Sequence, residues 1–524
     1  MEKTQTVEKT QRHVARAAIL VMAAFAVSRV LGVVRQIVFG HYFGTGASMD
    51  AYVAAQRIPE AIFFVVAGGA LGAAFIPLFT GRLARGETES AWKLASAVIN
   101  VLLIVLVPLS LLCILLAPWL VRVLVAPALP AETQAQCAAL MRVMLLSTAI
   151  FGVSGVVMGT LNANQHFLLP AIAPILYNLA LIGGGIWGGS TGLGPMGPAI
   201  GTVVGAVVHL LVQVPGLARY GARYWPIVGR GDPGVVEVGR LMAPRVLGVA
   251  AMQVNMLVTS NLASRLGAGA IAALEYAWLI TLLPQGVFAQ AVGTAVFPTF
   301  AAQAARGETD ALRNTLTLML RVIVAVTLPA AVGLMALGQP IIAVVFQRGE
   351  FDATSTQAVA WALTFYALGL VGLSAIEVLA RAFYAMHDTW TPALAALLSV
   401  ALNVVLGLTL PQVFTALGGG GPHGGLALAS ALAFTVQMIV LLVLIYRRIG
   451  GFDARGLAGQ ALRVLLASVG MGVVLWGWMR VAPEGALVQS VGGVAIGVIV
   501  YAILALLLRI EELKQVVTMV LRRS

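Results

Sequence analysis

Short polar breaks divide this chain into a long series of apolar stretches, each about 20 residues long. A helix of about 20 residues crosses the hydrocarbon core of a bilayer. Composition agrees, because 60% of the 524 residues are hydrophobic and 10% are charged, against about 25% charged residues in soluble domains. We therefore predict an all-α polytopic membrane protein with about 14 transmembrane helices. The predicted spans are 17–40, 52–80, 94–117, 138–160, 168–188, 197–216, 241–264, 271–298, 313–338, 355–384, 392–410, 424–446, 461–481 and 486–508.

The basic residues are distributed unevenly between the two sides of these spans. With the N-terminus in the cytoplasm, the inside segments hold 23 of the 32 Lys and Arg residues and the outside loops hold four, namely Arg122, Arg265, Arg348 and Arg480. Cytoplasmic loops of membrane proteins carry such an excess. Both termini are therefore predicted to be cytoplasmic, and the net charge of +12 is a topology signal that needs no nucleic-acid partner.

An internal repeat organises the chain. Residues 50–63 align with residues 275–288 at an offset of 225, and residues 75–89 align with residues 296–310 at an offset of 221. Each unit contains six spans, an even number, so the two units are predicted to be parallel repeats related by an axis along the membrane normal. Two such lobes are typical of alternating-access transporters, whose substrate site lies between the repeats.

The repeat predicts the domain organisation. Spans 13 and 14 lie outside it and form a C-terminal helix pair. The predicted parts are a cytoplasmic segment 1–16, an N-lobe 17–220, a cytoplasmic linker 221–240, a C-lobe 241–448, a helix hairpin 449–510 and a cytoplasmic tail 511–524.

Charged residues within the spans indicate what the cavity binds. A guanidinium at mid-membrane costs roughly 2.5–3.5 kcal/mol on insertion scales, and Arg29 lies in the middle of the first span. Arg35 follows about 9 Å along the helix and about 120° around it, so both can border one broad cavity. Asp50 and Arg57 are seven residues apart and share one face of the second span. Arg245 is placed at the cytoplasmic mouth of span 7.

These five residues are the predicted substrate-binding residues. Arginine is suited to phosphate because its planar fork donates two hydrogen bonds, so we expect an anionic cargo. The structural alternatives are a buried ion pair at Arg29 and interfacial anchoring at the other arginines. Glu377 and Arg381, four residues apart, are predicted to pair with each other. The hairpin of spans 13 and 14 is predicted to line a groove for the apolar tail of an amphiphilic cargo.

Several motifs, taken with the fourteen-span layout, resemble the MurJ (MviN) lipid II flippases of the multidrug/oligosaccharidyl-lipid/polysaccharide (MOP) exporter superfamily, from about residue 17 to about residue 510. The resemblance implies V-shaped lobes and a bacterial cytoplasmic-membrane location. It also implies that Arg29 and Arg35 hold the pyrophosphate and sugar of lipid II, which is flipped from the inner to the outer leaflet for peptidoglycan synthesis, and that Asp50 is the family's acidic residue near span 2. The motifs are Ser28-Arg29-Val-Leu-Gly-x-x-Arg35, Phe43-Gly44, Asp50-Ala51, Ala74-Phe75-x-Pro77, Ala117-Pro118-Trp119, Leu161-Asn162 and Pro170-Ala171-x-Ala173-Pro174.

The chain departs from the family pattern at charged positions. Residues 63–69 of span 2 lack the usual base and glutamate, and residues 276–279 of span 8 read Tyr-Ala-Trp-Leu in place of Tyr-Ala-x-Arg. Of the sodium site that some members have, Asn403 is a remnant, with Thr259 and Gly407 where its acidic residues would lie. We therefore predict no metal site, and an anionic headgroup held by fewer cations.

Other functional classes fit the sequence less well. A multidrug cation extruder would need carboxylates in its cavity, and an ATP-driven pump would need a Gly-x-x-x-x-Gly-Lys-Ser/Thr loop, whereas none of the four lysines follows a glycine. A glycosyltransferase would show paired acids at a membrane face, so no enzyme is predicted. The expected partners are lipid II and membrane lipids, without a cofactor, and the expected drive is an ion gradient, the membrane potential or downstream consumption. A flippase of another polyprenyl-linked glycan and a transport-inactive scaffold for cell-wall synthesis enzymes are the alternatives.

Overall fold

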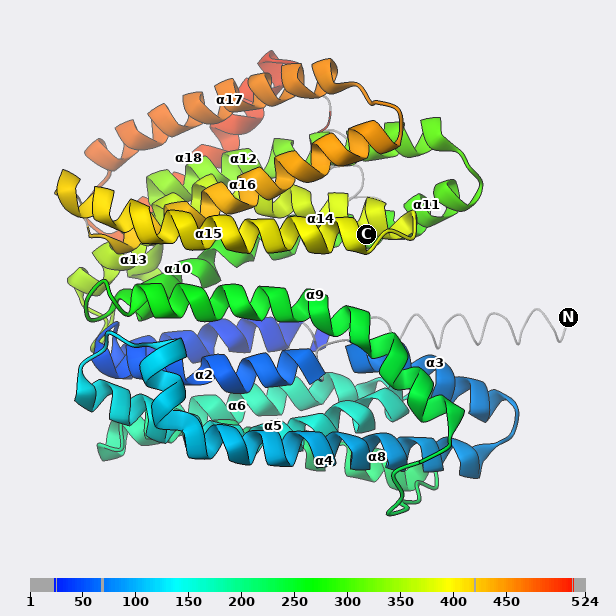
Figure 1. The fold of residues 1–524 in the computed structure, drawn as a ribbon. Helices are drawn as coiled ribbons and strands as arrows, with labels where there is room; N and C mark the ends of the chain where they lie inside the picture. Colours follow the sequence, from blue (N-terminus) through cyan, green and yellow to red (C-terminus); the bar gives the residue numbers. More distant parts are fainter. Residues whose placement is uncertain (1–22, 25, 67–69, 419–420, 511, 513–524) are drawn as a thin grey trace, which may run out of the picture. The chain divides into compact units, whose positions relative to one another are not determined.

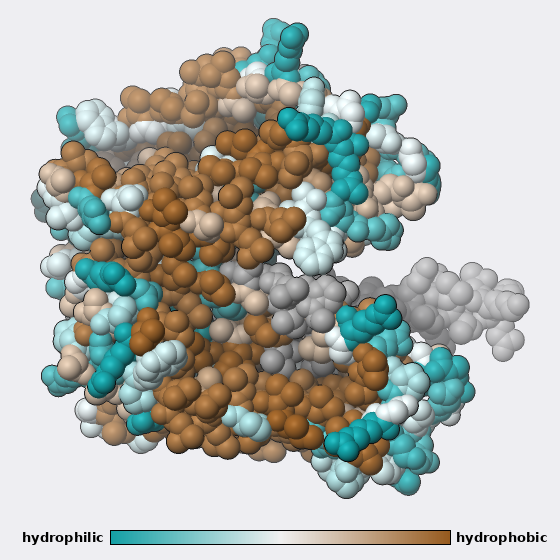
Figure 2. All heavy atoms as spheres, viewed as in Figure 1, coloured by the Kyte–Doolittle hydropathy of each residue, from teal (hydrophilic) through white to brown (hydrophobic). Residues whose placement is uncertain are grey.

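The structure is a computed structural model of the chain, and it describes all residues except 1–22, 25, 67–69, 419–420, 511 and 513–524. The described residues form helices joined by turns and short extended segments, without a β-strand. The chain forms two compact units, Met1–Ala268 (unit 1) and Gly269–Ser524 (unit 2). Apolar side chains cover the middle of the helices in each unit, and hydrophilic side chains gather at helix ends (Figure 2). This pattern is that of helices that span a membrane.

In the described part of unit 1, the helical segment 26–43 is followed by nine further helical elements (Figure 1). The element α4 continues without a break into the π-helical turn η1, which gives one span of 38 residues, Thr88–Val125. The elements are α2 Ala47–Val66, α3 Ala70–Ala84, α4 Thr88–Leu120, η1 Val121–Val125, α5 Ala131–Ala163, α6 Leu168–Thr191, α7 Met196–Leu211, α8 Val214–Arg219 and α9 Pro233–Ala263.

Unit 2 contains the remaining helices. The elements α10, η2 and α11 form one continuous span, Ala270–Ala305, and α13 and α14 are bent by 46° relative to each other at their break. The elements are α10 Ala270–Pro284, η2 Gln285–Gln290, α11 Ala291–Ala305, α12 Thr309–Phe346, α13 Ala353–Leu368, α14 Leu370–Ala385, α15 Trp390–Leu417, α16 His423–Arg448, α17 Ala454–Val481 and α18 Ala486–Leu507.

The all-α membrane fold predicted from the sequence is confirmed. Among the described residues, 10 helices are long and apolar enough to cross a membrane, or 11 if the bent pair α13–α14 is one span. They coincide with predicted spans 3 to 6 and 8 to 14. The predicted spans 17–40, 52–80 and 241–264 fall on the segment 26–43, on α2 with α3, and on α9. None of these three segments is among the 10 or 11 helices, so the count of 14 stays a prediction. All three contain arginines that were assigned to the cavity.

The two units divide after α9, at Ala268 and Gly269. Sequence correspondence groups residues 241–264 with the C-lobe and places a linker at 221–240. In the structure α9 packs along α2 and α3 of unit 1. By packing, span 7 is therefore part of unit 1, whereas by repeat it opens the second half of the chain. The remaining domain boundaries stay predictions.

The sequence repeat is visible in the backbone of each unit. The helices α4 and α12 begin at Thr88 and Thr309, at the offset of 221 that aligns the sequences. The turns before them contain Gly86 at φ +77° and Gly307 at φ +68°, a left-handed conformation that glycine adopts without strain. The same glycine-containing turn therefore precedes the corresponding long helix in both units.

Capping residues fix where several helices begin. Asp232 accepts a hydrogen bond from Gly234 N at the start of α9, Asp352 accepts one from Ser355 N before α13, and Asp453 does the same before α17. Each carboxylate satisfies an amide that the helix leaves open. The helix pair α17–α18 then packs on α12 through a buried apolar cluster that includes Leu337, Val464, Met471, Leu475 and Tyr501.

Candidate functional site

Arg35 has the most sharply defined surroundings of the predicted site residues. It lies half-buried on the segment 26–43, and its Nη1 donates a hydrogen bond to Asn178 Oδ1 of α6 at 3.4 Å. Asn178 Nδ2 donates to Ser28 Oγ at 3.4 Å and to the Pro174 carbonyl at 3.0 Å. Because Ser28 and Arg35 are seven residues apart, they lie two turns apart on one helix face. That face is directed toward α6.

One nitrogen of the Arg35 guanidinium has an unsatisfied hydrogen-bond donor. Its Nε is buried and has no hydrogen-bond partner among the described residues. Tyr52 of α2 and Tyr177 of α6 lie within electrostatic range of the guanidinium. Gly205 of α7 leaves room for Tyr177, because a Cβ there would lie 2.6 Å from the ring. A buried donor without a partner costs about 1–3 kcal/mol, so an oxygen ligand at this position would be stabilising.

The acid and base predicted on the second span both lie on α2. Asp50 is fully buried in the first turn of the helix. Arg57 Nη1 lies 3.9 Å from Glu60 Oε2, and the two side chains are 11% and 44% exposed. Glu60 lies within electrostatic range of the same two tyrosines as Arg35. The pair Arg57–Glu60 and the Arg35 guanidinium therefore share one polar region inside unit 1.

Of the other two predicted residues, only Arg29 has a described side chain. Arg29 is exposed on the segment 26–43, which agrees with its rotation of about 120° from Arg35. Arg245 lies within α9, and its side chain is outside the part of the structure that is described. Arg29 and Arg35 thus lie on two different faces of one helix.

Sequence reasoning did not single out Asn178, Tyr52, Tyr177 or Glu60. The signal for Asn178 was present, because it is an amide inside the apolar span 168–188 and such groups seek partners in a membrane. Glu60 lies three residues after Arg57, a spacing at which helix side chains meet. The two tyrosines had no comparable signal, since their place beside Arg35 depends on how α2, α6 and α7 pack.

In unit 2 the predicted structural pair is confirmed. Arg381 Nη1 donates to Glu377 Oε2, and Gln285 Nε2 lies 3.4 Å from Glu377 Oε1. Asn403 Oδ1 accepts a hydrogen bond from Ser430 Oγ at 3.2 Å. Within the described residues, no group of three or more His, Cys, Asp and Glu side chains is placed to hold a metal ion.

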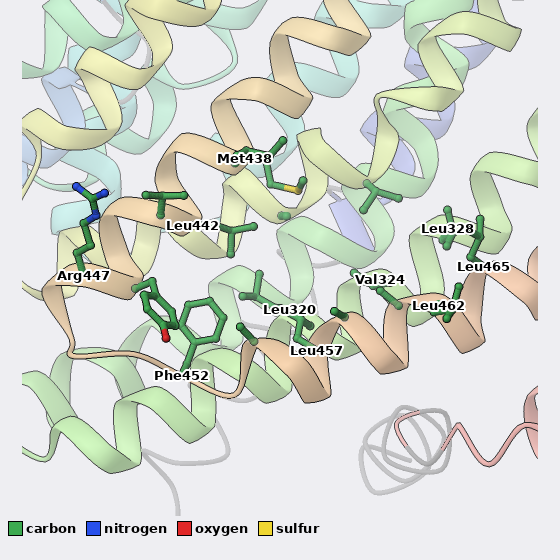
Figure 3. Close-up of a pocket in the computed structure, with 18 residues that line it drawn as sticks. Leu320, Val324, Leu328, Met438, Leu442, Arg447, Phe452, Leu457, Leu462 and Leu465 are labelled. Atoms are coloured by element: carbon green, nitrogen blue, oxygen red, sulfur yellow. The ribbon is translucent and has the colours of Figure 1, made fainter.

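An apolar groove of about 820 Å³ runs along unit 2 between α12, α14, α16 and α17. Figure 3 shows Arg447 and Phe452 near one end of it, and Leu328 and Leu465 near the other. Helix α17 supplies one wall, as predicted for the C-terminal helix pair, whereas α18 supplies none and packs on α12 and α17 instead. The lining residues are Leu320, Val324, Leu328, Val371, Ala375, Met438, Ile439, Leu442, Val443, Tyr446, Arg447, Phe452, Ala454, Leu457, Ala458, Ala461, Leu462 and Leu465.

Comparisons with known proteins place these features in a family context. The family model described as "Lipid II flippase MurJ" matches residues 39–511. A probable lipid II flippase MurJ of Vibrio cholerae is 30% identical over 441 residues, which are 81% of this chain and 82% of the relative. The lipid II flippase MurJ of Burkholderia cenocepacia is 30% identical over 477 residues, 88% of this chain and 89% of the relative.

Solved structures agree with the sequence comparisons. A lipid II flippase MurJ in an inward closed conformation matches with a TM-score of 0.79 and 25% identity, over 94% of this chain and 99% of that one. An inward-facing multidrug resistance MATE family transporter of the MOP superfamily matches with a TM-score of 0.68 and 18% identity, over 82% of this chain and 98% of that one. The second likeness concerns the fold alone.

Proposed function

Because the chain belongs to the lipid II flippase MurJ family, we propose that it moves lipid II from the inner to the outer leaflet of the bacterial cytoplasmic membrane by alternating access, for peptidoglycan synthesis. The observation that carries the proposal is the half-buried guanidinium of Arg35, whose buried Nε has no hydrogen-bond partner among the described residues and which lies within electrostatic range of two tyrosines. A cation kept inside a membrane-spanning unit is costly unless an anion uses it. A pyrophosphate is such an anion.

The two arginines of the first helix have different roles in this proposal. Arg29 is exposed. It contacts the pyrophosphate of lipid II when the lipid leaves the inner leaflet. Arg35 is tied to Asn178 and binds the headgroup in a fixed geometry, because a planar guanidinium donates to two oxygens at once. Arg57 and Arg245 are secondary contacts, and the buried Asp50 holds the start of α2. The departures from the family pattern in spans 2 and 8 make Arg35 the more important cation here.

The polyprenyl tail is assigned to the groove of unit 2. Its lining is almost entirely aliphatic, which suits a hydrocarbon chain. Lipid tails are as apolar as leucine side chains, so transfer from bilayer to groove gains little free energy. The groove therefore orients the tail, and the affinity comes from the headgroup.

The proposal extends to topology and partners. Both termini are cytoplasmic, as the distribution of Lys and Arg indicates. The membrane potential or an ion gradient drives the cycle, since moving one charge through 100 mV changes its free energy by about 2.3 kcal/mol. Cell-wall synthesis enzymes are further candidate partners, and another polyprenyl-linked glycan is the second candidate cargo.

Exposure of lipid II on the outer leaflet tests the proposal. Bacteria depleted of their own flippase would express this chain, its Arg35→Ala or Arg29→Ala variant, or Arg122→Ala as a control at an exposed arginine outside the site. An externally added lipid II hydrolase then reports the exposed lipid. We expect exposure with the parent and the control, and a loss of at least about tenfold with Arg35→Ala. No exposure with a well-expressed parent would contradict the proposal and favour another glycan or a silent scaffold.

A further inference from the structure

An extended segment crosses the outside of α4 in unit 1. It comprises Ala222–Gly229, between α8 and α9, and is called the strap below. Trp225 N donates to Ser96 Oγ at 3.2 Å. Asn100 Nδ2 donates to the carbonyl oxygens of Trp225 and Ile227 at 3.1 and 2.7 Å. The strap is therefore held to α4 at Trp225 and Ile227 by side chains of that helix.

Side chains of the strap reinforce this attachment. The Tyr224 hydroxyl donates to Asn100 Oδ1 at 2.6 Å, and Lys93 Nζ lies 5.8 Å from the centroid of the Trp225 ring. Asp232, just beyond the strap, accepts hydrogen bonds from two nitrogens of Arg82 while it caps α9. Chain conformation and anchoring thus fix which strap side chains are presented outward.

The strap lies where the lipid-facing surface of α4 begins. The first strongly exposed large apolar residues of α4 are Ile104, at 58%, and Val105, at 53%. They are one helical turn beyond Asn100, or about 6 Å along the axis. The span Thr88–Val125 has 38 residues, about 57 Å of helix against a hydrocarbon core of about 30 Å. The N-terminal part of α4 therefore projects out of the core, and the strap lies at the level of the headgroups.

The outward surface combines apolar side chains with cations. Tyr224, Ile227 and Val228 are 62%, 37% and 39% exposed. Four exposed arginines surround them, and among the described residues none of the four forms an ion pair. Of the nearby acids, Asp232 is bound by Arg82, and Glu89 is bound by Lys93 and lies within electrostatic range of Arg223. Glu237 on α9 is the third, so the four arginines still outnumber the acids that are not bound by another base. The four are Arg219, Arg223, Arg230 and Arg240.

We propose that the strap and these four arginines form a binding surface for anionic phospholipid headgroups. Tyrosine and tryptophan prefer the interface between headgroups and hydrocarbon, and exposed guanidinium groups attract lipid phosphates, with each basic residue near the surface strengthening binding by about fivefold. Because the strap leads directly into α9, bound lipid holds the first turn of that helix. This proposal is independent of which cargo the chain transports.

A label on the strap tests the surface in a membrane. Val228→Cys, in a background with Cys113→Ala and Cys137→Ala, would carry an environment-sensitive fluorophore, and the protein would be placed in nanodiscs of phosphatidylcholine alone or with phosphatidylglycerol. We expect a blue shift and lower quenching by iodide when phosphatidylglycerol is present. Replacing the four arginines by glutamine should raise the phosphatidylglycerol fraction needed for half-maximal protection severalfold.

The control removes the same charge elsewhere. Arg122, Arg265, Arg348 and Arg480 are also exposed, so their replacement by glutamine should leave the label's response unchanged. Melting temperatures of both fourfold variants show that they are folded. A label that iodide quenches fully in both membranes would overturn the proposal and favour an acidic protein as the partner. A label that is protected to the same degree in both membranes, whether or not the arginines are replaced, would also overturn it, because apolar insertion alone would then explain the contact.

Discussion

At the scale of single residues, helix geometry decides which arginine is held. Arg29 and Arg35 lie on one helix about 120° apart, so they cannot both face α6. The structure directs Arg35 toward Asn178 and leaves Arg29 exposed. The residue types and the spacing were therefore predictable. The partner was not, because Asn178 is 143 residues away in the chain and meets Arg35 only when α6 packs on the first helix.

Asn178→Ala should weaken headgroup binding at Arg35, although it removes only a small side chain. The change removes the acceptor for Arg35 and the donor to Ser28, so the guanidinium loses its fixed orientation. We expect lower lipid II exposure by about fivefold or more and a loss of stability of about 1–2 kcal/mol. The hydrolase assay and thermal unfolding measure the two effects. Ser28→Ala is the control, since it removes a hydrogen bond from Asn178 but none from the cation; equal losses of exposure in both variants would contradict this reading.

Asp232→Asn should lower stability in a pH-dependent way. The hydrogen bond from Arg82 holds the pKa of the Asp232 carboxyl below its usual value. The folded pKa lies below the unfolded one, so the stabilisation is complete above the unfolded value of about 3.9 and is lost as pH falls through the folded pKa. At pH 7 the variant should lose about 1–2 kcal/mol.

Thermal unfolding at several pH values checks this effect. The difference between parent and Asp232→Asn should shrink as the pH is lowered below the ordinary aspartate range. Glu87→Gln is the control, because Glu87 pairs with the exposed Arg85 and such pairs contribute little. A difference between parent and Asp232→Asn that stays constant over the whole pH range would show that the carboxylate charge is not the cause.

At the scale of elements, the length of the apolar runs in the sequence predicted most of the membrane-spanning helices. The exceptions are segments that contain charged residues. Predicted spans 3 to 6 and 8 to 14 coincide with helices that can cross a membrane. The segments that contain Arg29, Arg57 and Arg245 did not meet that criterion. Helix α2 contains three charged residues, Asp50, Arg57 and Glu60, and the other two segments are not fully described. The groove was predicted for both helices of the C-terminal pair, but only α17 lines it. Sequence position outside the repeat could not tell which helix of the pair would face the groove.

Filling the groove should slow transport without unfolding the protein. Ala461→Trp on α17 places a large ring among the lining residues and competes with the tail for space. We expect lipid II exposure to fall by several-fold, less than with Arg35→Ala, because the tail gains little free energy in the groove. The hydrolase assay measures exposure. Val498→Trp on α18, at a site that is 65% exposed and outside the groove, is the control; a larger effect there would rule out the groove as the tail site.

At the scale of the whole molecule, the proposed function assigns the headgroup of the cargo to one unit and its tail to the other. The repeat was readable from sequence, and the matched starts of α4 and α12 agree with it. The units have diverged, since unit 1 contains the Arg35 region and unit 2 the apolar groove. At one matched position, Arg82 binds Asp232 in unit 1, whereas its counterpart Gln303 binds Thr315 in unit 2. Packing of α9 with unit 1 could not be read from the repeat, because correspondence in sequence does not determine contacts.

The charge of the proposed cargo predicts how transport depends on the membrane potential. A pyrophosphate diester carries about two negative charges, and outward movement through an inside-negative potential lowers its free energy by about 2.3 kcal/mol per charge per 100 mV. Collapse of the potential with an ionophore should therefore slow lipid II exposure. In the proposed cycle the charge that crosses the field belongs to the cargo, so Arg29→Gln should reduce the rate at every potential and leave the dependence of the rate on potential unchanged. A weaker dependence in Arg29→Gln would mean that the guanidinium itself moves through the field, and exposure that is insensitive to the potential in the parent would exclude direct electrical drive.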